Sequence, residues 1–185
     1  MKIASISEDK KIEKRVSITP EIAKKYISNG FEVFLSKNYG DHLGFSDQEY
    51  ESLGVKLAEN NKEVIKDSDI VIQLGLPTDE NLSYFQENQI LIGVFNPYSN
   101  KNKLDELNKK KINMFSLELL PRITRAQSMD ILSSQANLAG YKAVVESFAY
   151  FQKAIPMMMT AAGTIPAAKV LVVGAGVAGL QAIAT

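Results

Sequence analysis

The stretch that decides the fold reads Lys169-Val170-Leu171-Val172-Val173-Gly174-Ala175-Gly176-Val177-Ala178-Gly179-Leu180. It is an aliphatic run that passes directly into the spacing G-x-G-x-x-G and then into an alanine-rich segment. This order predicts a buried strand, a tight turn and the start of a helix. That is the local context in which a glycine-rich loop binds a dinucleotide.

Each glycine of this loop has its own task in such a turn. Gly174 permits the tight turn, Gly176 lets the backbone approach a pyrophosphate, and Gly179 allows the helix to pack closely on the strand. The unpaired N–H groups at the helix N-terminus attract the phosphates. The candidate cofactor-binding residues are therefore Gly174, Ala175, Gly176, Val177, Ala178 and Gly179. A tight βα turn that binds nothing is the structural alternative to this interpretation.

An acidic residue about 20 positions after such a loop holds the adenosine ribose and helps to choose NAD over NADP. The sequence stops at Thr185, before that position. The loop therefore does not tell NAD from NADP. We expect the chain to belong to a longer polypeptide, with a second domain truncated after its first βα turn.

Upstream of this stretch, signals for short strands and helices alternate. Strands are expected at residues 2–7, 31–35, 69–74, 90–94 and 112–116. Helices are expected between the cap residue Thr19 and Gly30, between the cap residue Ser46 and Gly54, and over residues 101–110. Repeated βα units favour a mostly parallel sheet with helices on both faces. The predicted fold class is therefore α/β, with two Rossmann-like, doubly wound parallel-sheet domains.

The alternation of short strand and helix signals ends at Leu120-Pro121-Arg122. Residues 126–153 then run without proline and with one glycine, Gly140, which predicts a long helix. The expected organisation is an N-terminal α/β domain over residues 1–125, a connecting helix over 126–153, and the start of a Rossmann domain over 154–185.

Composition excludes several classes of function. Lys and Arg number 21, as do Asp and Glu, so no basic field would attract nucleic acid. There is no cysteine, and the single histidine, His42, lies in a polar loop, so no metal site is predicted. Pro156, Pro166 and Lys169 interrupt the apolar residues 154–185, so this segment is not expected to insert into a membrane. No secretory signal opens the chain, which favours the cytosol.

A second cluster of polar residues follows Pro121. Gln127, Asp130, Ser133 and Ser134 recur three or four positions apart, so a helix would place most of them along one side. Such a stripe could orient a carboxamide and a ribose. It could equally be a helix start, with Asp130 at the positive end of the helix dipole and Arg122 paired nearby. The spacing leaves both interpretations open.

Three segments carry a resemblance to a known family: Glu13–Pro20, Pro121–Tyr141, and Thr160–Lys169 with the glycine loop. Together they resemble the alpha subunit of proton-translocating NAD(P) transhydrogenases, and the likeness extends over essentially the whole chain. The opening motif Glu13–Pro20 is also shared with alanine dehydrogenases. In the transhydrogenases, the positions that match Arg122, Gln127, Asp130 and Ser133 surround the nicotinamide and its ribose. The resemblance therefore implies nicotinamide positioning by Gln127 and Asp130.

The resemblance also implies an activity and an assembly. NAD(H) would bind here and NADP(H) on a separate domain, with direct hydride transfer from NADH to NADP⁺ coupled to proton translocation by membrane segments. The expected partners are that NADP(H)-binding domain, the membrane domain and a second copy of the chain. The expected location is the cytoplasmic face of the bacterial inner membrane, with this segment itself soluble. The fragment alone is expected to be inactive.

Alanine dehydrogenases are the main competing family. They use a lysine after the third aliphatic strand and a histidine after the fourth for substrate binding and proton transfer. Those places correspond here to Gly75 and Asn96, and neither residue can do that work. The loss of both fits transfer between two nicotinamides, which needs only apposition of the rings. An amino-acid dehydrogenase with its acid and base elsewhere, and an inactive nucleotide-binding remnant, remain as alternatives.

Overall fold

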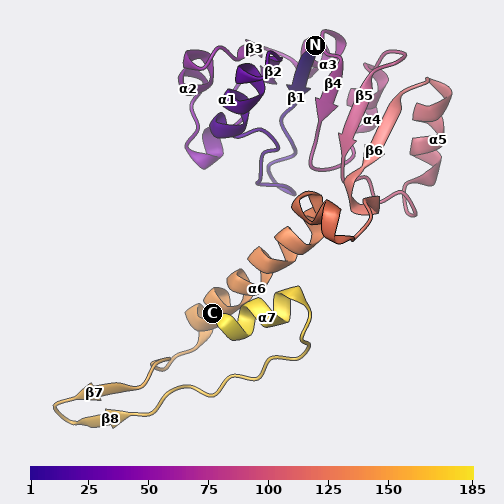
Figure 1. Ribbon diagram of the computed structural model, residues 1–185. Helices are drawn as coiled ribbons and strands as arrows, with labels where there is room; N and C mark the ends of the chain where they lie inside the picture. Colours follow the sequence, from indigo (N-terminus) through magenta and orange to yellow (C-terminus); the bar gives the residue numbers. More distant parts are fainter. The chain divides into compact units, whose positions relative to one another are not determined.

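The computed structural model describes residues Met1–Thr185, which form two compact units, Met1–Leu120 and Pro121–Thr185 (Figure 1). The division between the units falls at Pro121, where the alternating pattern of the sequence ends, and the sequence placed it near residue 125. The long helix lies within the C-terminal unit.

The N-terminal unit is built on a six-stranded parallel sheet. Its strands are β1 (Lys2–Ser5), β2 (Glu32–Ser36), β3 (Lys56–Ala58), β4 (Ile70–Ile72), β5 (Ile90–Gly93) and β6 (Asn113–Ser116). The strand order is β3-β2-β1-β4-β5-β6, which is the order of a doubly wound, nucleotide-binding type of sheet. The predicted α/β class and parallel sheet are confirmed. The edge strand β3 was not predicted, because Lys56-Leu57-Ala58 has no aliphatic run.

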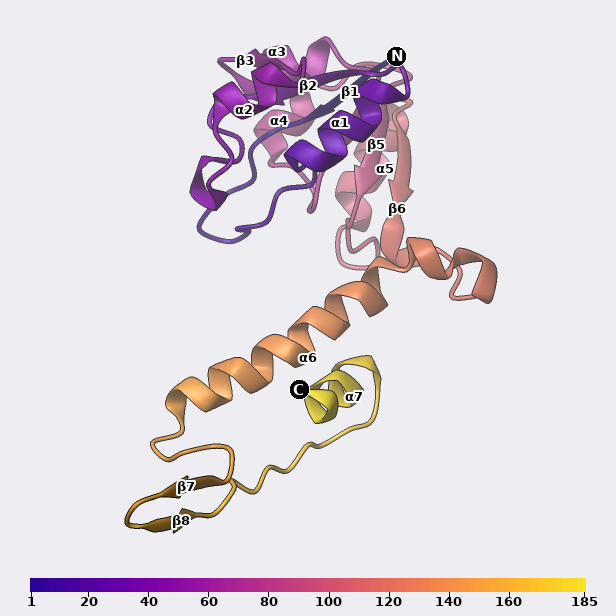
Figure 2. The same ribbon diagram turned by 60° about the vertical axis from the view of Figure 1, so that its left-hand side comes forward.

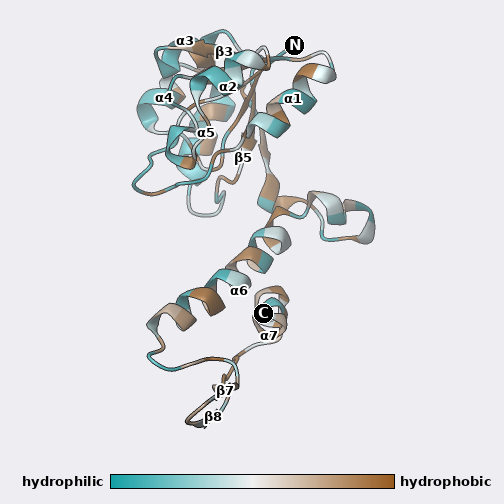
Figure 3. Ribbon diagram, turned by 90° about the vertical axis from the view of Figure 1, so that its left-hand side faces the viewer, coloured by the Kyte–Doolittle hydropathy of each residue, from teal (hydrophilic) through white to brown (hydrophobic).

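Helices cover both faces of this sheet. They are α1 (Pro20–Ser28), α2 (Asp47–Ser52), α3 (Asn61–Lys66), α4 (Asp79–Ser83) and α5 (Lys101–Lys109). Successive side chains of a strand point to opposite faces, so Ile3 packs in the core that includes Ala23 of α1, while Ala4 packs in the core that includes Val64 of α3. In Figure 3 the apolar colour gathers on strands such as β5, and the outer faces of the helices are polar. Each face of the sheet thus has its own hydrophobic core.

The helix signals read from the sequence have direct structural counterparts. The Thr19 hydroxyl accepts the Ile22 N–H at 3.4 Å and the Ser46 hydroxyl accepts the Glu49 N–H at 3.2 Å, so both act as N-caps. Gly30 and Gly54 follow the helix ends at φ values of 84° and 91°, a region that glycine adopts at little cost. These predicted helix boundaries are confirmed.

The C-terminal unit contains two helices that lie side by side (Figure 2). They are α6 (Ile131–Tyr150) and α7 (Val177–Ala184), and between them the chain forms an exposed antiparallel hairpin of β7 (Met158–Thr160) and β8 (Gly163–Ile165). Helix α6 begins later than the expected residue 126, because Thr124–Met129 forms a 3-10 turn and Asp130 then caps the helix. No helix of the chain has the length and apolar character needed to span a bilayer.

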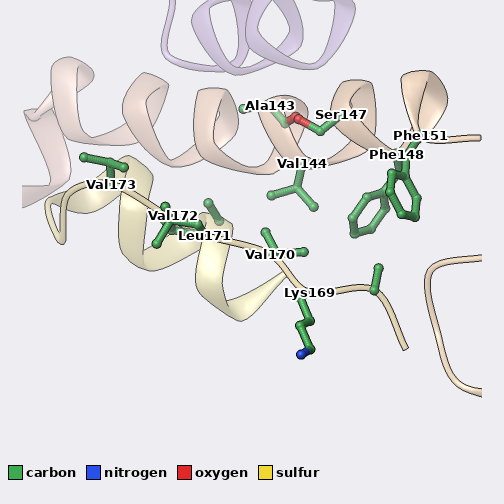
Figure 4. A pocket seen from close by; sticks show the side chains of 12 residues that line it. Ala143, Val144, Ser147, Phe148, Phe151, Lys169, Val170, Leu171, Val172 and Val173 are labelled. Carbon is green, nitrogen blue, oxygen red and sulfur yellow. The ribbon is translucent and has the colours of Figure 1, made fainter. Parts of the chain in front are cut away.

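The strand expected at Lys169–Val173 does not form. A parallel strand needs neighbours to accept and donate its backbone hydrogen bonds, and β7 and β8 pair with each other instead of with this run. Leu171 is 87% exposed. Between the run and α6 lies an apolar cavity of about 410 Å³, lined by side chains such as Val144, Phe148 and Val170 (Figure 4). The prediction of a strand was therefore wrong for this chain, although α7 follows the glycine loop.

Candidate functional site

A cavity in the C-terminal unit lies between the start of α6 and the glycine loop, with a volume of about 410 Å³. Arg122, Ser133 and Ala136 contribute from the α6 side. The glycine loop supplies the facing wall through Gly174, Gly176, Val177, Ala178 and Gly179. The two segments that the sequence singled out separately therefore line one cavity.

The backbone of the glycine loop explains why glycine stands at two of its positions. Gly174 has a φ of 103°, a conformation that L side chains rarely adopt. Gly179 is pressed against the loop, since a Cβ there would overlap the carbonyl oxygen of Gly174 and lie 2.8 Å from its carbon. Gly176 differs from both, because its φ of −76° is ordinary and a Cβ there would enter open space. Its bare Cα leaves room beside the loop backbone.

The N-terminus of α7 opens onto this cavity. The first intrahelical hydrogen bond of α7 runs from the Leu180 N–H to the Gly176 carbonyl at 2.8 Å. The N–H groups of Val177, Ala178 and Gly179 precede it and have no carbonyl one turn back within the helix to accept them. Arg122 is the charged residue of the cavity lining, and no carboxylate lines it. Donors, a cation and the positive end of a helix dipole suit an anionic group such as a pyrophosphate.

Asp130 acts as the N-cap of α6. Its carboxylate accepts the Ser133 N–H at 2.9 Å and the Ser133 hydroxyl at 2.6 Å. The hydrogen bonds from Ser133, with a smaller contribution from the nearby Arg122 charge, lower the pKa of Asp130 below its ordinary value of 3.8. The helix-start interpretation of the polar stripe therefore describes what Asp130 does in the structure.

Three of the sequence-predicted residues do not line the cavity. Asp130 caps α6 beside it, and Ala175 lies at the exposed tip of the loop. Gln127 lies in the 3-10 turn Thr124–Met129 and is exposed. Their cofactor-binding roles stay predictions.

The N-terminal unit has a smaller cavity of about 300 Å³, lined by residues that follow β1 and β4. These strands are neighbours at the point where the strand order reverses, which is where open parallel sheets bind ligands. Glu8 occupies this place: one of its carboxylate oxygens accepts the N–H groups of Leu74 at 2.8 Å and Gly75 at 3.3 Å. Burial raises the pKa of Glu8 above its ordinary value of 4.5, and these hydrogen bonds offset only part of that rise.

Glu8 was missed by reasoning from the sequence. The available signal was an acidic residue just after the first strand, and its meaning depends on knowing that β1 pairs with β4.

Gly75 carries no side chain, and Asn96 is exposed at a positive φ of 49°. Arg15 pairs with Glu13 at 2.6 Å, and the His42 ring lies 2.7 Å from the Lys14 carbonyl oxygen.

Comparison with known proteins now places these features in a family. A family model described as alanine dehydrogenase/PNT, N-terminal domain, matches residues 5–139, and the corresponding C-terminal domain model matches residues 143–185. The chain belongs to the alanine dehydrogenase/PNT family.

Within this family the similarity is greater to transhydrogenases. The chain is 46% identical over its whole length to the first part of the NAD(P) transhydrogenase alpha subunit of Rickettsia prowazekii and spans 49% of that protein. It is 29% identical over 83% of its length to alanine dehydrogenase 1 of Staphylococcus aureus, of which it spans 40%. The crystal structure of transhydrogenase from Sinorhizobium meliloti matches it at a TM-score of 0.91 and 43% identity, over 98% of this chain and 52% of that one.

These values confirm the resemblance to the transhydrogenase alpha subunit that the sequence motifs indicated. The chain spans about half the length of the transhydrogenase relative from Rickettsia prowazekii. Both domain types of the alanine dehydrogenase/PNT family are thus represented in it, the N-terminal one over residues 5–139 and the C-terminal one over residues 143–185.

Proposed function

We propose that the C-terminal unit binds NAD(H) within the NAD(H)-binding component of a proton-translocating transhydrogenase. The observation that carries this proposal is the single cavity lined by Arg122, Ser133 and the glycine loop Gly174–Gly179. The family membership and the names of the relatives support it.

Different residues of the cavity suit different groups of a dinucleotide. The N–H groups at the start of α7 and the Arg122 guanidinium suit the pyrophosphate, and the open space beside Gly176 admits it. The Ser133 hydroxyl lines the same cavity and suits a ribose hydroxyl. Asp130 holds Ser133 in place, and Gln127 would orient the nicotinamide carboxamide from the neighbouring turn.

The chemistry comes from the cofactor, which when bound supplies the hydride for NADP⁺. The residues of this chain bind and orient, and no acid or base is required of them. This matches the N-terminal unit, where Gly75 and Asn96 offer no proton-transferring side chain.

The proposed assembly follows from the same function. A separate domain would hold NADP(H), a membrane domain would couple hydride transfer to proton translocation, and two copies of the chain would associate. The location would be the cytoplasmic face of the bacterial inner membrane.

The polypeptide Met1–Thr185 by itself should bind NADH far more weakly than the full subunit. It spans about half the length of the transhydrogenase relatives, so it would supply only part of the contacts to the cofactor. Isothermal calorimetry on both proteins measures the difference. Micromolar affinity of the short polypeptide would contradict this prediction of weak NADH binding.

The positioning role of Gln127 is tested against the binding role of the loop. In the full subunit, Gln127→Asn should lower the hydride-transfer rate more than it weakens NADH binding, because a shorter side chain disturbs orientation and leaves the pyrophosphate contacts intact. Gly176→Val should abolish NADH binding first, because the side chain fills the space beside the loop. Single-turnover hydride transfer to a separately prepared NADP(H)-binding component gives the rate, and an NADH titration gives the affinity.

The matched control for Gln127→Asn is Gln152→Asn, the same shortening at an exposed position that does not line the cavity. It should leave both rate and affinity unchanged. Equal losses of rate and affinity in Gln127→Asn would reject the positioning role. Wild-type behaviour of Gln127→Asn would assign the stripe to capping α6 alone.

An amino-acid dehydrogenase is the second candidate, and Glu8 is the observation in its favour. Its raised pKa and its place between β1 and β4 resemble those of a catalytic acid or base. Against it, the same carboxylate is engaged by the N–H groups of Leu74 and Gly75. Reduction of pyruvate with ammonium and NADH would reveal such an activity, and Glu8→Gln should remove it.

A further inference from the structure

Gly140 is the one glycine inside the long helix α6. Glycine weakens a helix interior relative to alanine, so its presence there calls for a structural reason. Gly140 is buried, whereas Ala139 and Tyr141 beside it are exposed. The position therefore faces a packed neighbour.

That neighbour is the backbone of α7. A Cβ atom at position 140 would overlap the carbonyl oxygen of Ala178 and would lie 2.9 Å from its carbonyl carbon and 3.0 Å from its Cα. These are main-chain atoms, which cannot turn aside as a flexible side chain could. The bare Cα of Gly140 is what allows the first turn of α7 to rest directly on α6.

The same face of α6 also forms one wall of the cavity. Ala136 and Ser133 precede Gly140 by four and seven residues, so they lie above it along one side of the helix. Both line the cavity, and Ala178 belongs to its opposite wall. The contact between Gly140 and Ala178 therefore sets the separation of the two walls.

The glycine loop is attached to α7 by its own close contact. The absent Cβ of Gly179 lets the Gly174 carbonyl lie against the helix. A displacement of α7 from α6 would carry the loop with it and leave the loop's internal geometry unchanged.

We propose that Gly140 is a positioning residue that fixes the distance between the glycine loop and the Ser133 face of α6. The proposal rests on the NAD(H) site proposed above. A ligand that touches both walls should depend on this distance, and a ligand that touches only the loop should not. NADH has a nicotinamide ribose that would reach Ser133, while ADP has the pyrophosphate for the loop and no such ribose.

The test compares NADH and ADP affinities of Gly140→Ala in the full-length protein. The methyl group must push the first turn of α7 away by roughly 1 Å, so the dissociation constant for NADH should rise roughly tenfold or more and that for ADP by less than roughly threefold. Gly179→Ala, which disturbs the loop itself, should weaken both ligands together. Asn137→Ala, an exposed change on the same helix, is the matched control and should alter neither affinity.

The outcomes separate the two proposals. Equal weakening of NADH and ADP by Gly140→Ala, or unchanged binding of both, would overturn the positioning role while leaving the NAD(H) site standing. A Gly140→Ala protein that stays unfolded even with saturating ADP would assign Gly140 to general packing, which also overturns it. Failure of the unaltered protein to bind NADH would reject the proposed function, and this inference with it.

Discussion

Two aliphatic runs, one in each unit, differ in whether they form a paired strand. Ile90-Leu91-Ile92-Gly93 forms β5, which pairs with β4 on one side and β6 on the other, and Leu91 is fully buried. Val170-Leu171-Val172-Val173 pairs with nothing, and Leu171 is 87% exposed. The difference lies in the neighbours, because β-propensity expresses packing in a sheet more than a preference of the backbone itself.

A pair of leucine substitutions, one in each run, measures this difference in stability directly. Leu91→Ala should cost about 2–5 kcal/mol of unfolding free energy, because it leaves a cavity in a closed core. Leu171→Ala, the same substitution in the unpaired run, should change stability by no more than about 0.5 kcal/mol. Urea denaturation of both variants of residues 1–185, followed by circular dichroism, makes the comparison.

A large loss of stability in Leu171→Ala would contradict the contrast between the two runs. A loss above about 1 kcal/mol would lie outside the range of exposed sites. It would mean that the run is covered in solution, for example by a second copy of the chain, and gel filtration at several concentrations would then show association.

The sequence predicted five of the six strands of the N-terminal unit, because each lies in a short segment that contains apolar side chains and falls between predicted helices or turns. It failed at β3, where parallel pairing with β2 makes Lys56–Ala58 a strand, and at Lys169–Val173, where the pattern is strong and no strand pairs with it. Local pattern therefore predicts a strand only when the rest of a sheet is present.

The candidate site shows a similar limit. Arg122, Ser133 and the glycine loop were singled out from separate motifs, and their meeting in one cavity depends on how α7 packs on α6. Glu8 could not be predicted, because its setting is created by the pairing of strands 65 or more residues apart. Contacts between distant segments therefore create both the cavity beside the glycine loop and, in the other unit, the setting of Glu8.

A smaller loss of stability is expected from removing a buried hydroxyl group, that of Tyr39. The Tyr39 hydroxyl accepts the N–H groups of Ser17 at 3.0 Å and Ile18 at 3.2 Å and lies 2.8 Å from the Ser5 hydroxyl. Tyr39→Phe leaves these groups without that partner and should cost about 1–3 kcal/mol. Tyr150→Phe in the C-terminal unit is the matched control: its side chain is 84% exposed, so it should change stability by less than about 0.5 kcal/mol. Equal unfolding midpoints for the two variants would show that the buried network contributes nothing.

The least change in stability is expected from two carboxylates, Glu8 and Asp130, which both accept backbone N–H groups but whose pKa values shift in opposite directions. Glu8 is partly buried, and burial raises its pKa above 4.5 despite those hydrogen bonds. Asp130 is half-buried, and the same kind of hydrogen bond, from Ser133, outweighs its burial and lowers its pKa below 3.8. The neighbouring charges differ as well: Glu13 and Arg15 act on Glu8 in opposite directions, while Arg122 alone acts on Asp130.

The two shifts predict opposite dependences of stability on pH. The folded N-terminal unit holds the Glu8 proton after the unfolded chain has lost it, so its contribution to stability is complete below pH 4.5 and is lost as the pH rises through the folded pKa. The contribution of Asp130 is present above pH 3.8 and is lost as the pH falls through its lower folded pKa.

Glu8→Gln keeps an oxygen acceptor and should therefore stabilise the N-terminal unit slightly at pH 7 and not at pH 4. Asp130→Asn keeps a capping oxygen and should weaken α6 slightly at pH 7 and not at pH 2. Carbon-13 NMR titration of both carboxyl groups measures the pKa values directly, and amide exchange in each unit measures the stability. A Glu8 pKa at or below 4.5 would show that the hydrogen bonds from Leu74 and Gly75 outweigh burial, and the carboxylate would then be a fixed anion between β1 and β4 at every pH near neutrality.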